Sequence, residues 1–110
     1  YAFQGIGQVW KKEFNFKIHC IIAILVILAG FVLRLSKWEW IVIILCIGIV
    51  LLAEMLNSAI EALMDYMFKD FHPVCKQVKD ISAGAVLIVA LTAAIIGVII
   101  FGSKLYNLFL

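Results

Sequence analysis

Carboxylate and amide side chains interrupt an apolar part of the chain in the stretch AEMLNSAIEALMD, and their types and spacing could do chemistry. Glu54, Asn57, Glu61 and Asp65 fall at positions i, i+3, i+7 and i+11, which an α-helix places on one stripe. Ser58 adds a hydroxyl beside them. Ionisable groups in or beside a bilayer are expensive and normally mark a site. The stripe therefore predicts a functional site.

A second polar group, Lys76, Lys79 and Asp80, stands where the last apolar stretch begins, and Glu13 stands among lysines before the first one. We expect Asp80 in or just before the first turn of a helix, where a carboxylate is favourable. Mg²⁺ prefers few carboxylates together with waters and substrate phosphates. Phosphoryl transfer needs positioning, charge neutralisation and an acceptor for the proton of the nucleophile. These residues form a credible set for magnesium, phosphate and proton transfer, but their spacing alone names no reaction.

The same charged residues also have structural interpretations. Asp65, with the lysine that follows it, could mark only the exit of a membrane helix into water. Glu54 and Glu61 could form structural ion pairs with Lys79 and Lys76, respectively. A functional site and a set of structural ion pairs therefore both remain open at this point.

Other polar and small residues favour structural roles more strongly. Glu13 is an exception, because a site role and a role that only balances its neighbouring lysines both stay open. His19, near the start of an apolar run, is expected to pack or snorkel. His72, directly before a proline, is expected in a loop or at a helix start, because no second His or Cys has the spacing of a metal site. Small residues at helical spacing predict a helix–helix interface rather than a ligand site; they are Ala90, Ala93, Ala94 and Gly97.

The composition is that of a membrane protein. Of 110 residues, 66% are hydrophobic and 15% charged, whereas a soluble domain has about half apolar and about a quarter charged residues. The net charge of +2, without a dense basic cluster, argues against a nucleic-acid partner. One proline and no low-complexity linker predict a single domain, 1–110. The three cysteines fit neither a disulfide framework nor a zinc site, and we expect reduced thiols.

Three continuous apolar stretches predict an all-α membrane protein with spans at about 18–35, 38–66 and 81–102. A membrane helix needs about 20 apolar residues, and the runs do not alternate as barrel strands would. No small-residue cleavage site follows the first run, so we expect no cleavable signal peptide. The chain opens on Tyr1 rather than Met, and we expect its native start to lie before this residue.

The basic residues predict the topology. More lysines flank the start of the first span and occupy the second connection than lie on the opposite side, so the N-terminus and second loop are expected in the cytoplasm. Glu54 lies 16 residues after Trp38, about 24 Å along a helix, which is just inside the far edge of a core about 30 Å thick. Glu61 lies roughly 10 Å further along, at headgroup level or in water. This depth suits a reaction between a lipid and a soluble molecule.

The segments EMLNSAIEALMD and FHPVCKQVKDISAGAV closely resemble the bacterial diacylglycerol kinase and undecaprenol kinase family. The segment YAFQGIGQVWKKEFNFKIH resembles the part of that family before its first membrane helix, so the resemblance covers nearly the whole chain. It implies three transmembrane helices per subunit and a homotrimer in the bacterial cytoplasmic membrane, with active sites shared between neighbouring subunits. It also implies transfer of the γ-phosphoryl group of ATP to a lipid hydroxyl, with Mg²⁺.

The resemblance further implies roles for individual residues. Glu54 corresponds to the catalytic base, and Asn57 to a residue that orients the nucleophile or a phosphate. Glu13 and Glu61 correspond to carboxylates that bind the metal accompanying ATP. The positions that correspond to nucleotide contacts, beyond these two carboxylates, are Tyr1, Asp70, Phe71, His72, Lys79 and Asp80.

Departures within the family favour one branch of it. His72 followed by Pro73 resembles the undecaprenol kinases, and Ala83 stands where the diacylglycerol kinases have serine. Phe71 replaces a common tyrosine and keeps its ring. The family's amphipathic N-terminal surface helix is expected to be mostly absent before Tyr1. We therefore expect a polyprenol acceptor, whose phosphate would carry wall-polymer precursors, with a diacylglycerol kinase making phosphatidic acid as the close rival.

Two functions of other classes stay open on the residues alone. A cation- or proton-conducting assembly could use Glu54 and Glu61 as relay groups, but it leaves Glu13, Lys79 and Asp80 unexplained. A non-catalytic helical subunit could use its polar residues only to hold copies together. The kinase predicts ATP turnover that depends on Glu54, and neither of the others does.

Overall fold

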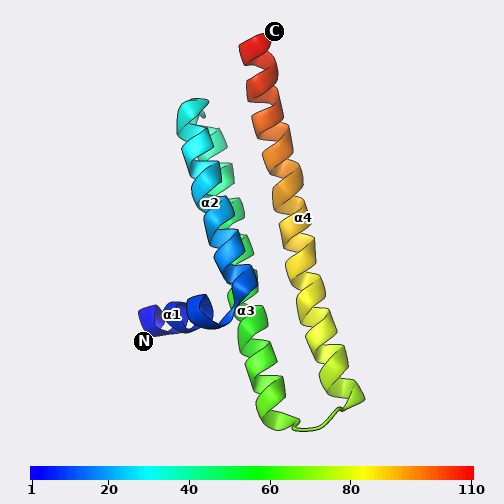
Figure 1. Ribbon diagram of the computed structural model, residues 1–110. Coiled ribbons are helices and arrows are strands. Elements are labelled where there is room, and N and C mark those ends of the chain that lie inside the picture. The colour runs from blue at the N-terminus through cyan, green and yellow to red at the C-terminus, as the bar shows by residue number, and fades with distance from the viewer.

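The computed structural model describes residues 1–110 as four helices without a strand. In Figure 1, α2, α3 and α4 run along the long axis of the molecule, and α1 projects sideways from them near the N-terminus. The molecule measures 58 × 28 × 20 Å. The helices are α1 (Ala2–Lys12), α2 (Phe14–Val32), α3 (Lys37–Met67) and α4 (Pro73–Phe109).

Three of the helices, α2, α3 and α4, are long and apolar enough to cross a membrane. The most apolar 18-residue stretches of these helices have mean hydropathies of 2.2, 2.5 and 2.8. This confirms the predicted all-α class with three candidate spans. Because α4 has 37 residues, it is about 55 Å long and exceeds a hydrocarbon core of about 30 Å. The charged residues of α4 lie on turns beyond its apolar part: Lys76, Lys79 and Asp80 before it, and Lys104 after it.

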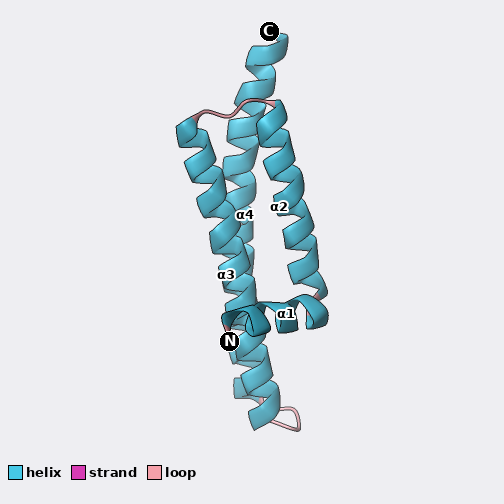
Figure 2. Ribbon diagram, turned by 90° about the vertical axis from the view of Figure 1, so that its left-hand side faces the viewer, coloured by secondary structure: helices cyan, strands magenta, loops and turns pink.

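Helix α1 is an amphipathic surface helix of 11 residues with no buried side chain. Figure 2 shows it lying across the lower part of the bundle. Its Ile6 and Trp10 border a hollow shared with Phe16 of α2 and Leu51 of α3. No helix was predicted before the first span, and residues 2–12 form one because they segregate apolar and polar side chains.

The turn between α2 and α3 ends α2 without a glycine. Arg34 adopts a positive φ of 55°. Its N–H donates to the carbonyl of Phe31 at 3.4 Å, and the N–H of Leu35 donates to the carbonyl of Gly30 at 3.1 Å. This pair of bonds is a Schellman motif, which satisfies the last carbonyls of a helix. Leu35 is buried beneath the turn.

Helix α3 then begins with a capping box. The Ser36 hydroxyl accepts from the Glu39 N–H at 3.3 Å, and the Glu39 carboxylate accepts from the Ser36 N–H at 2.8 Å. Lys104 of α4 lies 3.0 Å from the same carboxylate. Ser36, Glu39 and Lys104 are therefore paired with one another.

Helix α4 begins earlier than predicted. The Nδ1 atom of His72 accepts from the Val74 N–H at 3.1 Å, and Pro73 occupies the first helical position, where its missing N–H has no consequence. His72 is therefore a helix-start residue, as expected. The prediction that Asp80 lies in or just before the first turn is wrong, because this cap starts α4 seven residues upstream of it.

Burial is sparse and unusually polar. Nine of 110 residues are buried, and three of them are Glu54, Ser58 and Ser82. Helix α4 packs along α3 but makes no comparable contact with α2. A mainly apolar groove of about 420 Å³ is left among the three helices, and the small residues of α4 from Ala90 to Gly97 border it. Within one chain these residues face this groove, and their packing against another copy stays a prediction.

Candidate active site

Glu54 is the best-buried polar residue of the chain. It lies in α3, and only 4% of it is exposed. Its Oε1 atom lies 3.2 Å from Nε2 of His19 in α2. No lysine or arginine forms an ion pair with it. The structural alternative of a Glu54–Lys79 pair is therefore wrong, and the expectation that His19 merely packs or snorkels missed its contact with Glu54.

The lysines pair with other carboxylates. Lys79 lies 2.7 Å from Asp65, and Lys76 lies 2.6 Å from Asp80. The register of α4 along α3 places Lys79 opposite the last turns of α3, three turns beyond Glu54. The alternative of a Glu61–Lys76 pair is wrong for a local reason, because Lys76 reaches the carboxylate four residues away on its own helix. Both ion pairs are largely solvent-exposed.

A chain of hydrogen bonds joins α4 to the polar stripe of α3. The Ser82 hydroxyl donates to Oδ1 of Asn57 at 2.7 Å, and Nδ2 of Asn57 donates to Oε1 of Glu61 at 3.1 Å. Ser82 is 8% exposed. Sequence reasoning missed Ser82, although it lies three residues after Lys79 and thus on the same face of α4. The bonds fix the amide of Asn57 in one orientation.

Ser58 completes the buried part of the site. Its hydroxyl is buried and has no hydrogen-bond partner within the chain. Native proteins leave few such groups, and each needs an explanation. Ser58 lies one turn from Glu54 and one turn from Glu61 on α3. The hydroxyl is therefore available to a group that enters the site or to a second copy of the chain.

The remaining predicted site residues lie further out. Tyr1 is exposed at the start of α1, and Glu13 is half-buried at the junction of α1 and α2. Asp70 and Phe71 are exposed in the connection between α3 and α4, and His72 caps α4. Within one chain, no hydrogen bond or ion pair joins these residues to Glu54, Asn57 or Glu61, which the structure does bring together.

The carboxylates suit a magnesium ion that is shared with a substrate. No group of three or more His, Cys, Asp or Glu side chains is placed to hold a metal ion. Mg²⁺ is usually held by one or two carboxylates, with waters and substrate phosphates as its other ligands. Glu61 is half-buried, and Asn57 orients its carboxylate. The donor set fits magnesium brought in with a nucleotide rather than a preformed metal cage.

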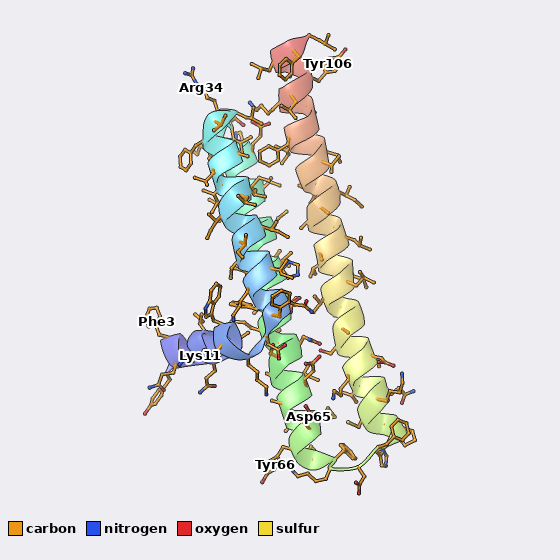
Figure 3. The ribbon with its side chains drawn as sticks, in the orientation of Figure 1. Phe3, Lys11, Arg34, Asp65, Tyr66 and Tyr106 are labelled. Atoms are coloured by element: carbon orange, nitrogen blue, oxygen red, sulfur yellow. The ribbon has the colours of Figure 1, made fainter.

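The charged groups gather at opposite ends of the bundle. Figure 3 shows Lys11 and Asp65 in its lower half, and Arg34 and Tyr106 near its upper end. Glu54 lies between the apolar length of α3 and its polar last turns. Membrane-length helices with a buried carboxylate beside amide, hydroxyl and lysine groups define a multi-pass membrane protein with a polar site at one end of the bundle.

Comparison with known proteins gives the family. Residues 1–101 match the family model for prokaryotic diacylglycerol kinase. The chain therefore belongs to this family of bacterial lipid kinases, which implies ATP as the phosphoryl donor.

Individual relatives carry two different names. The chain is 41% identical to undecaprenol kinase of Bacillus subtilis (strain 168) over 105 residues, which cover 96% of this chain and 85% of that protein. It is 35% identical to diacylglycerol kinase of Synechocystis over 98 residues, 88% of this chain and 56% of that longer protein. It is 28% identical to diacylglycerol kinase of Escherichia coli (strain K12) over 95 residues, which cover 86% of this chain and 78% of that protein.

Proposed function

We propose that this protein transfers the γ-phosphoryl group of ATP to the hydroxyl of undecaprenol, at the cytoplasmic surface of the bacterial membrane. The observation that carries the proposal is the Glu54 carboxylate, 4% exposed and without a lysine or arginine partner at the polar end of a membrane-length helix. Undecaprenol is favoured over diacylglycerol by the relative with 41% identity and by the His72–Pro73 pair. Diacylglycerol is the alternative acceptor.

In the proposed reaction, Glu54 accepts the proton of the lipid hydroxyl. The hydroxyl oxygen attacks the γ-phosphorus, the bond from that phosphorus to the β–γ bridging oxygen breaks, and ADP leaves with the electron pair. A carboxylate within about 3 Å of the hydroxyl suffices for this step. Asn57, oriented by Ser82, holds the nucleophile or a phosphate oxygen in line.

The cationic part of the site handles the phosphates of ATP. Lys79 exchanges its contact with Asp65 for a phosphate oxygen. Asp80, which contacts Lys76, takes part in nucleotide binding. Glu61, together with Glu13, would hold Mg²⁺, which supplies charge neutralisation on the phosphates when bound. Preorganised positive charge around the transferring group is normally the largest contribution to this kind of catalysis.

The apolar groove supports a lipid acceptor. It is bordered by 15 residues, 13 of them hydrophobic, and His19 stands on its wall. Because His19 also contacts Glu54, the proposed proton acceptor lies next to a residue of the groove wall. A long isoprenoid chain can lie among apolar side chains here while its hydroxyl stays at the carboxylate. The volume of about 420 Å³ accommodates a segment of such a chain.

A homotrimer would complete the site. Only nine of 110 residues are buried in a single chain, and α4 has no buried residue within its most apolar window. Glu13, Tyr1 and the loop that carries Asp70 and Phe71 lie apart from Glu54 in one chain, so we propose that neighbouring subunits contribute part of the nucleotide site. Cross-linking of the detergent-solubilised protein tests the trimer directly, and a monomer with full activity would contradict it.

The test of the proposed function is phosphate transfer from labelled ATP in detergent micelles with magnesium. Undecaprenol and diacylglycerol are offered separately to the wild type, to Glu54→Gln and to Glu39→Gln. We expect strong labelling of undecaprenol, a loss of at least about 10²-fold in Glu54→Gln, and a rate close to that of the wild type in Glu39→Gln. The control removes a carboxylate charge from the same helix at its opposite end.

Each other outcome changes a different part of the proposal. Preference for diacylglycerol would keep the mechanism and overturn the choice of acceptor. An active Glu54→Gln variant would remove Glu54 as the proton acceptor. No transfer to either lipid by the folded wild type would overturn the kinase function, and ion flux would then be measured in vesicles.

A further inference from the structure

The contact of Glu54 with His19 has no part in the reaction described so far. It is the one polar contact between side chains of α2 and α3, and it joins the best-buried carboxylate of the chain to an imidazole whose side chain is 24% exposed. We propose that His19 is a positioning residue: its Nε2 holds one oxygen of Glu54 and thereby aims the other oxygen at the lipid hydroxyl. This inference rests on the proposed role of Glu54 as the proton acceptor.

The contact with His19 can restrict the orientation of the Glu54 carboxylate. Nε2 lies 3.2 Å from Oε1 of Glu54, within reach of a hydrogen bond. A glutamate side chain has three rotatable bonds, and without a partner its carboxylate samples several orientations. Proton transfer requires one of them, and misplacement of a reacting group by about 1 Å can lower a rate about 10²-fold. A contact from a different helix restricts the carboxylate to the orientation that the bundle sets.

The place of His19 in the groove adds a second, independent observation. Among the side chains that border the groove, His19 is the only imidazole, and apart from the Cys46 thiol the others are apolar or lack a side chain. One edge of the ring therefore meets Glu54, and the ring itself forms part of the wall along which an apolar chain would lie. A residue that only stabilised Glu54 would not need to line the groove as well.

The backbone of α2 fixes His19 in turn. Ala23, one turn further along α2, is buried, and so is Phe16, one turn before it. Both buried residues lie on the helix that packs against α3, one turn on either side of His19. The position of the imidazole is therefore set by packing on both sides and does not depend on the contact with Glu54 alone.

The test compares three substitutions at one position in the full-length protein. His19→Gln retains an N–H donor at about the reach of Nε2, His19→Asn carries the same amide one methylene shorter, and His19→Leu removes the donor. We expect kcat to fall about 10²-fold in His19→Leu and His19→Asn, and His19→Gln to recover most of the rate. KM for ATP should stay at the wild-type value in all three, because Lys79 and Asp80 are untouched.

The outcomes separate this inference from the proposed function. If the wild type is active and Glu54→Gln is not, the function stands, and a wild-type kcat in His19→Asn or His19→Leu then overturns the role of His19 alone. Equal losses in His19→Gln and His19→Asn also overturn it, because the reach of the donor would be irrelevant. A purely structural His19 would lower the thermal midpoint of the variants and raise KM for ATP together with the loss of kcat. If His19→Leu does not fold, the comparison of kcat between His19→Gln and His19→Asn still tests the role of His19.

Discussion

The two ends of the helical bundle contain the same kinds of side chains and use them differently. At the α2–α3 turn, a serine, a glutamate and a lysine satisfy one another: Ser36 and Glu39 form the capping box, and Lys104 lies 3.0 Å from Glu39. Each of these groups is at least partly exposed. At this end the three groups stabilise a turn and the start of a helix by pairing with one another.

The other end buries its polar groups and leaves some of them incompletely paired. Glu54 has the imidazole of His19 as its one polar side-chain partner, and the hydroxyl of Ser58 has no partner. Burying such groups costs free energy unless they are paired. The fully paired arrangement at the α2–α3 turn would cost less folding free energy. The difference supports the proposal that the Glu54 end binds the substrates and carries out the reaction. The predictions below test this contrast between matched residues of the two ends.

The largest difference is expected between two lysines that each contact a carboxylate. Lys79 lies 2.7 Å from Asp65 at the site, and Lys104 lies 3.0 Å from Glu39 at the turn. Lys79→Met should lower kcat/KM for ATP by about 10²–10³-fold, the usual effect of removing one charged donor from a transferring phosphate. Lys104→Met should leave it near the wild-type value. Steady-state kinetics with varied ATP measure both, and equal activity of the two variants would contradict the contrast.

A smaller difference is expected between two serines of α4. Ser82 donates to Asn57 at 2.7 Å and is buried, whereas Ser103 is exposed near the far end of the same helix. Ser82→Ala should lower kcat about tenfold, as loss of a supporting hydrogen bond often does, because Asn57 loses its orientation. Ser103→Ala should have no effect. Lipid phosphorylation at saturating ATP gives kcat, and a wild-type rate in Ser82→Ala would remove Asn57 orientation from the mechanism.

Much of the bundle could be predicted from the chain because its signals are local. Long apolar runs predicted three membrane-length helices, and the spacing of Glu54, Asn57 and Glu61 predicted one stripe on one of them. The start of α4 was also readable, since His72 before Pro73 is a helix-start pattern. Placing Asp80 near the first turn ignored that signal in favour of the start of the apolar run.

The pairing of groups between helices could not be predicted, because it depends on register. Whether Lys79 meets Glu54 or Asp65 is decided by how far α4 slides along α3, and one turn moves a side chain about 5.4 Å. The same holds for His19, which meets Glu54 only because α2 packs on α3 at that height. Periodicity predicts the face of a helix on which a residue lies. It does not predict which residue of a neighbouring helix that face contacts.

The next difference is expected in the stability effects of alanine substitutions at two glycines, Gly30 near the α2–α3 turn and Gly102 in α4. A Cβ atom on Gly30 would lie 2.7 Å from the Trp40 ring and 3.0 Å from Leu35, whereas one on Gly102 would meet nothing within 4 Å. Gly30→Ala should destabilise by about 1–3 kcal/mol through overpacking, partly offset by about 1 kcal/mol of helix propensity. Gly102→Ala should gain only the propensity. The thermal midpoints in detergent should therefore shift in opposite directions, and a stabilised Gly30→Ala variant would show that Trp40 moves aside freely.

The smallest effect is expected from Ser36→Ala, and it tests the contrast from the structural side. The substitution removes the hydroxyl that accepts from the Glu39 N–H, a cap worth about 1 kcal/mol. The first turn of α3 should fray, and the thermal midpoint should fall by a few degrees, while kcat and both KM values stay unchanged because Glu54 lies more than four turns away along α3. Calorimetry and the kinase assay on the same preparation measure the two quantities. A loss of activity in proportion to the loss of stability would mean that the two ends of the bundle are coupled, and the division between a closing end and a working end would then be wrong.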